Sequence, residues 1–346
     1  MIAGNQYCKM KKLLFILSLA VIGCSFPVQL TLGTPTASPT SGPTPVFMVT
    51  PSATPEPGTE KNPLILALSP SLRPSDEMLA AGETIAAFIE SRTGYKLVPV
   101  VPASESELVY AFDRGNAHIA SLSPFAYLLA RENDSITAIL ASLREGQMFY
   151  GAQFIVNREN EFTSFYDPAR DENTAEALEA LKQFDGKKPC WSDPASPSGY
   201  VVPLGLLNQA QVPTRSGAFL GGQPSVVRAV YADDICDFGA TFIDARYSPA
   251  LEADYPDVMD RVIVTWRTPK IIPYENISMS TLLPFEMRRV IQRAFIDLML
   301  TPEGKSAMQS VYGIDEIQIV EDEMYMEFAN HVEASGLEPS QLLNPP

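Results

Sequence analysis

Short apolar runs alternate with amphipathic stretches along residues 63–154. The apolar runs have the length of buried strands, and the amphipathic stretches have the period of helices. Gly94 and Gly115 stand where two helices should end, because glycine readily adopts the conformation that closes a helix. The expected strands cover residues 64–68, 96–101 and 119–122, and the expected helices cover residues 76–92, 104–114 and a short segment from Pro124. Strands that alternate with helices through short links predict a parallel sheet in an α/β fold.

The same alternation returns in the second half of the chain. Strands are expected at residues 189–192 and 235–241, and helices at residues 200–208 and 225–231. The two halves share an architecture without forming a repeat array. We expect the chain to cross between them at residues 150–156 and near Ser278. The pattern predicts a two-lobed α/β fold with two crossover strands, each lobe being a mainly parallel sheet flanked by helices.

The whole chain is expected to consist of five consecutive parts. They are a lipoprotein signal peptide (1–24), a disordered linker (25–62), a first lobe (63–154), a second lobe (155–275), and a return to the first lobe with C-terminal helices (276–346). The linker is rich in Pro, Thr, Ser and Gly, so it cannot bury enough surface to offset the entropy of ordering. We interpret it as a spacer, the alternative being a recognition motif for a proline-binding domain.

The first 24 residues have the order of a targeting segment. Lys9, Lys11 and Lys12 precede an apolar stretch over residues 13–22, which is about half the length that a membrane-spanning helix needs. The stretch ends in Val21-Ile22-Gly23-Cys24, which resembles the lipobox of bacterial lipoproteins, whose cysteine becomes the lipidated first residue. An ordinary signal peptide with an incidental cysteine is the alternative. We expect Cys24 to be lipidated and to hold the protein on the outer face of a bacterial membrane.

The composition excludes several functional classes. With 25 Lys and Arg against 41 Asp and Glu, the formal net charge is −16, which argues against a nucleic-acid-binding protein. Two histidines in 346 residues make a histidine-based metal or acid–base site improbable. The chain also lacks the Gly-x-Ser-x-Gly, Gly-x-x-x-x-Gly-Lys, His-Glu-x-x-His and Cys-x-x-Cys motifs. We therefore expect no enzyme activity, no cofactor and no metal.

Two cysteines remain after the targeting segment is processed. Cys8 is removed and Cys24 is lipidated, which leaves Cys190 and Cys236 as an even pair in an oxidising compartment. Both lie near the beginnings of strands that should be neighbours in the second lobe. We predict a disulfide between them, the alternative being two buried thiols.

The segment from Cys190 to Pro203 combines a strand end with a helix start. The strand ends in small hydroxyl residues and a glycine, and the helix follows at once. That geometry directs unpaired backbone N–H groups and serine hydroxyls at one point, with the positive end of the helix dipole behind them. Such a site can hold an anion without a basic residue. A serine-rich helix cap has the same sequence, so spacing alone leaves both interpretations open.

The stretch Ser196-Pro197-Ser198-Gly199-Tyr200-Val201-Val202-Pro203 resembles the Ser-Thr-Ser-Gly-Tyr-x-x-Pro signature of phosphate/phosphonate-type periplasmic solute-binding proteins of ABC transporters. The stretch over residues 123–127, Tyr150 and residues 227–239 agree with that family in order, and the resemblance covers about residues 64–312. The chain departs from the signature at Pro197, where the family has threonine. That change removes one N–H group and one hydroxyl from the anion site.

The resemblance implies a ligand site between the two lobes. It places the ligand's phosphonate or phosphate oxygens on the helix start and adds tyrosine hydroxyls from the first lobe. The strand end near Thr241 and the following Asp244 would contact the other end of the ligand. The candidate ligand-binding residues are Ser71, Ser123, Tyr127, Tyr150, Ser196, Ser198, Gly199, Tyr200, Thr241 and Asp244.

These features together predict a lipid-anchored, monomeric solute-binding protein outside the cytoplasm. It would capture a small phosphate- or phosphonate-like anion and deliver it to the permease and ATPase subunits of an ABC importer. The alternative from another class is an extracytoplasmic sensing module that presents a bound solute to a receptor or kinase. An enzyme is the third interpretation, which the lack of a visible nucleophile–base pair disfavours.

Overall fold

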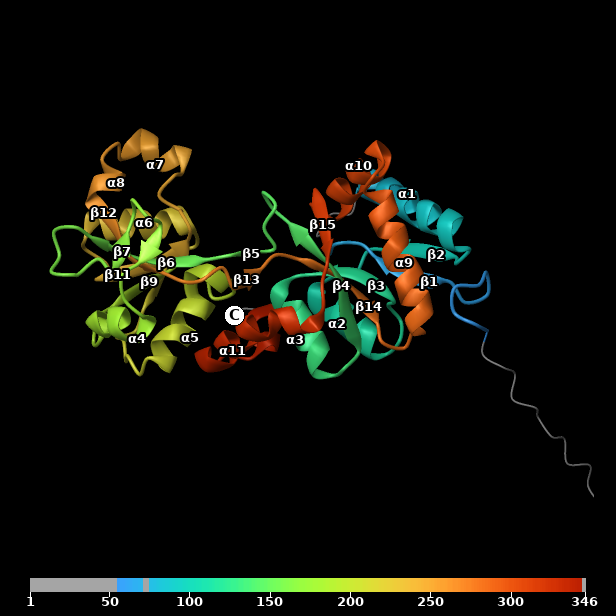
Figure 1. Ribbon diagram of the computed structural model, residues 1–346, viewed down its shortest axis with the longest axis horizontal. Helices are drawn as coiled ribbons and strands as arrows, with labels where there is room; N and C mark the ends of the chain where they lie inside the picture. The colour runs from blue at the N-terminus through green and yellow to red at the C-terminus, as the bar shows by residue number, and fades with distance from the viewer. Residues whose placement is uncertain (1–54, 71–74, 344–346) are drawn as a thin grey trace, which may run out of the picture. The chain divides into compact units, whose positions relative to one another are not determined.

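The computed structural model describes residues 55–70 and 75–343 (Figure 1). The predicted signal peptide with Cys24, most of the linker, and Ser71 lie outside the described residues. Residues 55–62, which the composition assigned to the linker, form a turn attached to the folded body. The Gly58 carbonyl accepts a hydrogen bond from the Lys96 amide at 2.8 Å, and the Gly58 amide donates to Asn62 at 2.8 Å. Backbone pairing orders this end of the linker despite its polar composition.

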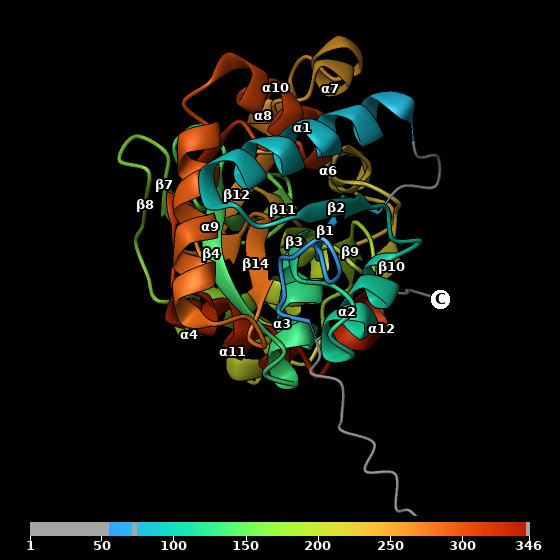
Figure 2. The same cartoon turned by 90° about the vertical axis from the view of Figure 1, so that its right-hand side faces the viewer.

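The first lobe is built on a six-stranded sheet in the order β15-β4-β14-β3-β1-β2. Its strands are β1 (Leu64–Ala67), β2 (Leu97–Val100), β3 (Ile119–Leu122), β4 (Ile136–Leu143), β14 (Asn276–Ser280) and β15 (Glu316–Ile319). Its helices are α1 (Asp76–Thr93), α2 (Glu105–Asp113), α3 (Pro124–Glu132), α9 (Phe285–Leu298) and α10 (Pro302–Tyr312). Helices α9 and α10 pack against α1 (Figure 2) and share an apolar core with β1. Residues of α2 and α3 form a second apolar cluster with residues of β1 and β3.

The second lobe is built on a five-stranded sheet in the order β10-β9-β11-β6-β12. Its strands are β6 (Ala152–Asn157), β9 (Pro189–Trp191), β10 (Ala218–Phe219), β11 (Phe238–Phe242) and β12 (Val262–Arg267). A two-stranded sheet of β7 (Tyr166–Asp167) and β8 (Glu172–Asn173) accompanies it. The helical segments are α4 (Ala177–Ala180), η1 (Leu181–Phe184), η2 (Pro197–Val201), α5 (Val202–Gln209), α6 (Gln223–Ala232), α7 (Pro249–Asp254) and α8 (Val258–Arg261).

Both sheets are mixed, whereas the sequence pattern predicts mainly parallel ones. Strands β1, β2 and β3 pair in parallel, as do β9, β10 and β11. Strands β14, β4 and β15 in the first sheet, and β6 and β12 in the second, pair antiparallel. Apolar runs identify buried strands but carry no information about direction, so strand order had to come from the tertiary structure.

The lobes are joined by β5 (Phe149–Tyr150) and β13 (Ile272–Pro273), which pair antiparallel and run between the two sheets in Figure 1. The sequence pattern predicts the crossovers a few residues later, at residues 150–156 and near Ser278. Those later segments are β6 and β14, which belong to the sheets themselves. The difference arises because a crossover strand and the buried sheet strand that follows it form one continuous apolar pattern.

The predicted helix starts agree with the structure in most places. Ser104 caps α2 by accepting from the Glu107 amide, and Pro124 opens α3. The helix expected from Tyr200 starts earlier, because η2 is a π-helical turn that opens at Pro197 and leads into α5. Proline suits this position, since its fixed φ fits a helix and an N–H in the first turn has no partner within the helix.

The C-terminal segment returns to both lobes after β15. It comprises η3 (Asp322–Tyr325), α11 (Met326–Ser335) and α12 (Pro339–Leu343). Helix α11 packs on α5 of the second lobe, and α12 packs on α3 of the first lobe. The contact between α5 and α11 is so close that a Cβ atom on Gly205 would lie 2.1 Å from the His331 carbonyl oxygen. Glycine at this position therefore permits the two helices to cross.

Substituting Gly205→Ala is expected to lower the free energy of unfolding by about 1–3 kcal/mol, because the added methyl group overlaps a backbone atom that cannot rotate away. Chemical denaturation measures the change. Gly222→Ala is the matched control, since a Cβ atom there meets only the Pro224 ring at 4.0 Å. Equal stability of the two variants would contradict the close crossing.

Candidate functional site

A cavity of about 770 Å³, here called the cleft cavity, is lined by residues of both lobes. Ser123 contributes from the start of α3 and Tyr150 from β5. Ser196 and Ser198 contribute from the start of η2, and Gln223 from the start of α6. Four of these five were predicted from the sequence, and they lie around one space because strand ends of the two sheets converge there.

The end of β9 and the start of η2 place three serine hydroxyls close together. We call Ser192, Ser196 and Ser198 the serine cradle. Ser196 caps η2, its Oγ accepting from the Gly199 amide at 3.0 Å, and Ser198 is only 3% exposed. A Cβ atom on Gly199 would lie 1.9 Å from the Ser192 Oγ. The cradle can therefore form only with glycine at that position.

Gln223 organises the serine cradle, and the sequence did not single it out. Its Nε2 lies 3.3, 3.2 and 3.4 Å from the Oγ atoms of Ser192, Ser196 and Ser198. Its Oε1 accepts from the Phe242 amide at 3.2 Å, which fixes the orientation of the side-chain amide. The only sequence signal was a glutamine after two glycines just before an expected helix. No spacing rule links it to serines some thirty residues earlier.

These contacts determine which way the cradle presents its protons. A hydroxyl has one donor and two acceptor positions. The Ser196 Oγ accepts from the Gly199 amide at 3.0 Å and lies 3.2 Å from Gln223 Nε2, whose two protons face three serine oxygens. The Ser196 hydroxyl proton is therefore left to donate into the cavity. A cradle that is polarised in this way offers hydrogen-bond donors to an anion.

Tyr150 faces the cradle from the first lobe side. Its ring stacks on Tyr274, with 5.0 Å between the ring centroids. Burial raises the pKa of Tyr150 to about 12, although a hydrogen bond with the Ser198 hydroxyl opposes the shift. The phenol therefore stays neutral near pH 7 and can donate a hydrogen bond to a ligand.

Charged residues of the cleft cavity do not provide a free cation. Among the described residues that line it, Arg144 is the one basic side chain. Its Nη2 lies 2.9 Å from a Glu275 carboxylate oxygen, and its guanidinium lies over the Tyr274 ring at 4.7 Å. Glu105, the other carboxylate with a defined partner, accepts from the Ser123 hydroxyl at 2.7 Å. An anion bound here would depend on neutral donors, each such bond contributing about 1.5–3 kcal/mol.

Residues 68–325 match a family described as the periplasmic substrate-binding protein of phosphonate ABC transporters. The chain belongs to this family. It is a family of transport substrate-binding proteins and not of enzymes, and its members act outside the cytoplasm. This confirms the family resemblance of the helix-start signature.

Two proteins that are similar to this chain agree with the family assignment. The phosphate-import protein PhnD of Mycolicibacterium smegmatis is 30% identical over 191 residues, which is 52% of this chain and 54% of that protein. The match thus spans about half of the mycobacterial protein. The structure of XAC2383 from Xanthomonas citri bound to chloride ion covers 79% of this chain and 97% of its own, with a TM-score of 0.56 and 15% identity. At that identity the likeness shows a shared fold.

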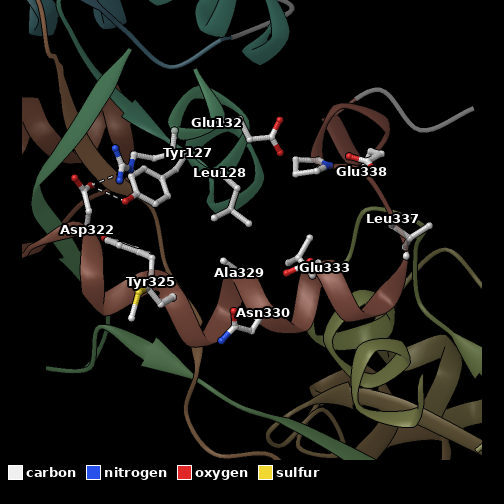
Figure 3. Close-up of a pocket in the computed structure, with 15 residues that line it drawn as sticks. Tyr127, Leu128, Glu132, Asp322, Tyr325, Ala329, Asn330, Glu333, Leu337 and Glu338 are labelled. Atoms are coloured by element: carbon white, nitrogen blue, oxygen red, sulfur yellow. Dashed lines mark hydrogen bonds and ion pairs between the residues drawn. The ribbon is translucent and has the colours of Figure 1, made fainter. Parts of the chain in front are cut away.

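Tyr127 does not lie at the cleft cavity with the other predicted site residues. Its hydroxyl donates to Asp322 Oδ1 at 2.6 Å, and its ring is 2% exposed. It lines a separate cavity of about 430 Å³ between α3 and α11, where Figure 3 shows Tyr127 and Asp322 pointing at each other. Burial and the Asp322 carboxylate hold the pKa of Tyr127 well above its ordinary value. The structure gives this hydroxyl the Asp322 carboxylate as its partner, away from the cleft cavity.

Carboxylates also gather in the separate cavity beside Tyr127. Glu132, Glu333 and Glu338 line it. Burial, together with the charge of Glu338, raises the pKa of Glu132.

No group of three or more His, Cys, Asp or Glu side chains suited to a metal ion occurs in the described part of the chain. Nor does any helix there have the length and apolar character needed to cross a membrane.

Thr241 and Asp244 do not line the cleft cavity. The Thr241 hydroxyl is fully buried and accepts from the Gln153 amide at 3.3 Å. Asp244 pairs with Arg246 at 2.6 Å and with Arg267 at 3.2 Å. Burial alone would raise the pKa of Asp244, but the hydrogen bonds and charge of Arg246 outweigh it and lower the pKa. These residues brace the segment whose Phe242 and Ile243 do line the cavity.

Tyr200 packs beside the cradle without lining the cavity. Its ring contacts Trp191 at 5.4 Å and Phe219 at 4.8 Å between ring centroids, and burial raises its pKa. The structure therefore brings part of the predicted set together and places the rest elsewhere. Gathered at the cleft cavity are Ser123, Tyr150, Ser196, Ser198 and the supporting Gly199, whereas Tyr127, Tyr200, Thr241 and Asp244 are not.

The structure contains the predicted disulfide between Cys190 and Cys236, with the Cα atoms 5.6 Å apart. Cys190 lies in β9, and Cys236 lies just before β11, the parallel neighbour of β9. Strand β9 leads directly into the serine cradle. The bond therefore anchors the strand that positions the cradle.

Substituting Ser198→Ala is expected to weaken binding of a phosphorus oxyanion about 10- to 100-fold, because one hydrogen bond to a charged group is lost. Tyr150→Phe should cost less, since the ring and its stacking remain. Ser91→Ala, on the exposed face of α1, is the matched control. Calorimetric titration provides the measurement. If Ser198→Ala and Ser196→Ala both bind as tightly as the parent, the serines only cap the helix.

Proposed function

We propose that this protein is the substrate-binding component of an ABC importer, and that it captures a small phosphate- or phosphonate-class anion in the cleft cavity. The observation that carries this proposal is the Ser196 hydroxyl, which lines the cleft cavity and faces amide donors from Gly199 and Gln223. Its proton is therefore available to a ligand in the cavity. The family assignment supports the same ligand class.

Capture would proceed by closure of the two lobes on the ligand. The anion would bind first to the serine cradle of the second lobe and then contact Tyr150, since the Ser123 hydroxyl already donates to Glu105. The paired strands β5 and β13 are the natural hinge, since a few residues at the ends of elements absorb such motions. The closed form would then dock on the permease, which the ATPase subunits drive.

A thermal-shift screen followed by calorimetric titration tests this function on the mature chain. The ligands are phosphate, phosphite, methylphosphonate, sulfate and unrelated neutral solutes. A ligand that binds only the folded state raises the melting temperature. We expect a phosphorus oxyanion to do so and neutral solutes to have no effect. A panel in which no phosphorus oxyanion binds would overturn the proposal.

We further propose that Cys24 is lipidated and tethers the mature chain to the outer face of a membrane. The order of basic, apolar and small residues over residues 9–24 supports this. Mass spectrometry of the mature N-terminus and membrane fractionation provide the test. A free amino terminus at another residue, with the protein in the soluble fraction, would refute it.

A further inference from the structure

The C-terminal helix α12 forms part of the wall of the cleft cavity. Leu342 and Leu343 line this cavity together with Ser196 and Ser198 of the cradle. The helix packs on α2 and α3, and α3 begins beside Ser123 in the same cavity. The end of the described chain is therefore part of the candidate site and not a peripheral tail.

The position of α12 is held by both lobes. Leu342 is 6% exposed and belongs to an apolar cluster with Phe328 of α11, Phe125 of α3 and Leu207 of α5. Leu343 packs at the margin of the same cluster and of the first-lobe cluster. Because this packing fixes Leu342 and Leu343, they form an ordered apolar surface toward the cavity.

Further apolar side chains extend this surface. Phe125 and Ile243 line the cavity, as does Phe242, which is 39% exposed although the rest of β11 is buried. The Phe242 backbone amide also donates a hydrogen bond to Gln223 Oε1, so this residue lies next to the serine cradle. An apolar group of a ligand that covers the exposed part of this ring would remove apolar surface from water and so strengthen binding.

The size and charge of the cavity further limit the class of ligand that can bind. About 770 Å³ is typical of sites for organic molecules, and an inorganic oxyanion would fill little of it. Glu105, Glu145 and Glu275 line the same cavity, while Arg144 is paired with Glu275. A second anionic group on the ligand would therefore meet carboxylates without a free cation.

We infer that the preferred ligand carries one phosphoryl group and one apolar carbon substituent larger than methyl. The phosphoryl oxygens bind the serine cradle, and the substituent lies against Leu343, Phe242 and Phe125. An alkyl- or arylphosphonate and an alkyl phosphate ester share this chemistry. The inference rests on the proposed function and adds the part of the ligand that α12 recognises.

Calorimetric titration of the mature chain compares phosphate, methylphosphonate, butylphosphonate, phenylphosphonate, butyl phosphate and 2-aminoethylphosphonate. Each methylene that becomes buried strengthens binding about fourfold, so butylphosphonate should bind about 10- to 60-fold more tightly than methylphosphonate. Comparing butylphosphonate with butyl phosphate distinguishes a phosphonate from an ester. Preference for phosphate, or for the aminoethyl compound through the carboxylates, would overturn the inference while leaving the proposed function intact. Binding of none of these ligands would overturn the function itself.

Two variants locate the substituent. Leu343→Asn should remove most of the gain of butyl- over methylphosphonate. The matched control is Leu337→Asn, because Leu337 lines the separate cavity beside Tyr127 instead. Phe242→Ala provides a second test at a partly exposed position, where folding tolerates the change. Unchanged butyl preference in both Leu343→Asn and Phe242→Ala would refute the role of this wall.

Discussion

Gln223→Glu is expected to abolish anion binding at neutral pH, with a loss of at least a hundredfold. The parent amide donates from Nε2 to the serine cradle and accepts the Phe242 amide at Oε1. A carboxylate accepts only, so the serine protons would turn toward it and away from the ligand. Two lost hydrogen bonds to a charged ligand cost about 3–6 kcal/mol in total. Repulsion between the carboxylate and the anion adds to this loss.

The pH profile separates this effect from a general loss of structure. An ordinary glutamic acid has a pKa of about 4.3, so the carboxyl group of the Gln223→Glu variant regains a proton, and with it a donor, only toward acid pH. The ratio of variant to parent Kd should therefore fall as the pH is lowered from 7 to about 4.5. Gln309→Glu, on an exposed position of α10, is the control for added charge and should bind like the parent. Normal binding by Gln223→Glu at pH 7 would show that Gln223 does not set the polarity of the cradle.

Replacing both bridged cysteines by alanine should lower the free energy of unfolding by up to about 4 kcal/mol. The bond closes a loop with a sequence separation of 46 residues, and loop-closure entropy gives a stabilisation of that size. Alanine is the appropriate substitution because Cys190 is fully buried and serine would bury a hydroxyl. Chemical denaturation of the variant and of the parent under non-reducing conditions measures the difference.

The parent denatured with reductant is the control, since it should be as unstable as the double variant. Thiol labelling of the denatured, non-reduced chain, followed by peptide mapping, should find neither Cys190 nor Cys236 reactive. Labelling of these two cysteines would contradict the disulfide. Because β9 leads into the serine cradle, we also expect the double variant to bind ligand more weakly than the parent.

Local sequence rules were sufficient for most helices, strands and caps. Ser104, Pro124 and Gly94 act within one turn of their own helices, so their effect depends on neighbours a few residues away. The serine-rich helix start at Ser196 is local in the same sense. The disulfide was also predictable, because Cys190 and Cys236 are the two cysteines outside the predicted targeting segment.

Long-range geometry decided the rest of the site. Tyr127 and Tyr150 are both tyrosines near the ends of elements, yet one hydroxyl is bound to Asp322 and the other faces Ser198. Apolar periodicity predicts that a residue is buried but not which buried neighbour it meets. For the same reason, the sequence did not predict the mixed strand order or the pairing of β5 with β13.

Gln223 and α12 show the limit most clearly. The sequence by itself determined the donors of the cradle, because a strand end followed by a capped helix start exposes N–H groups and hydroxyls wherever it occurs. Only the tertiary structure brought Gln223 against those hydroxyls and Leu342 and Leu343 into the same cavity. These contacts join residues far apart in the chain, and their free energy depends on how whole sheets and helices pack, which no local pattern encodes.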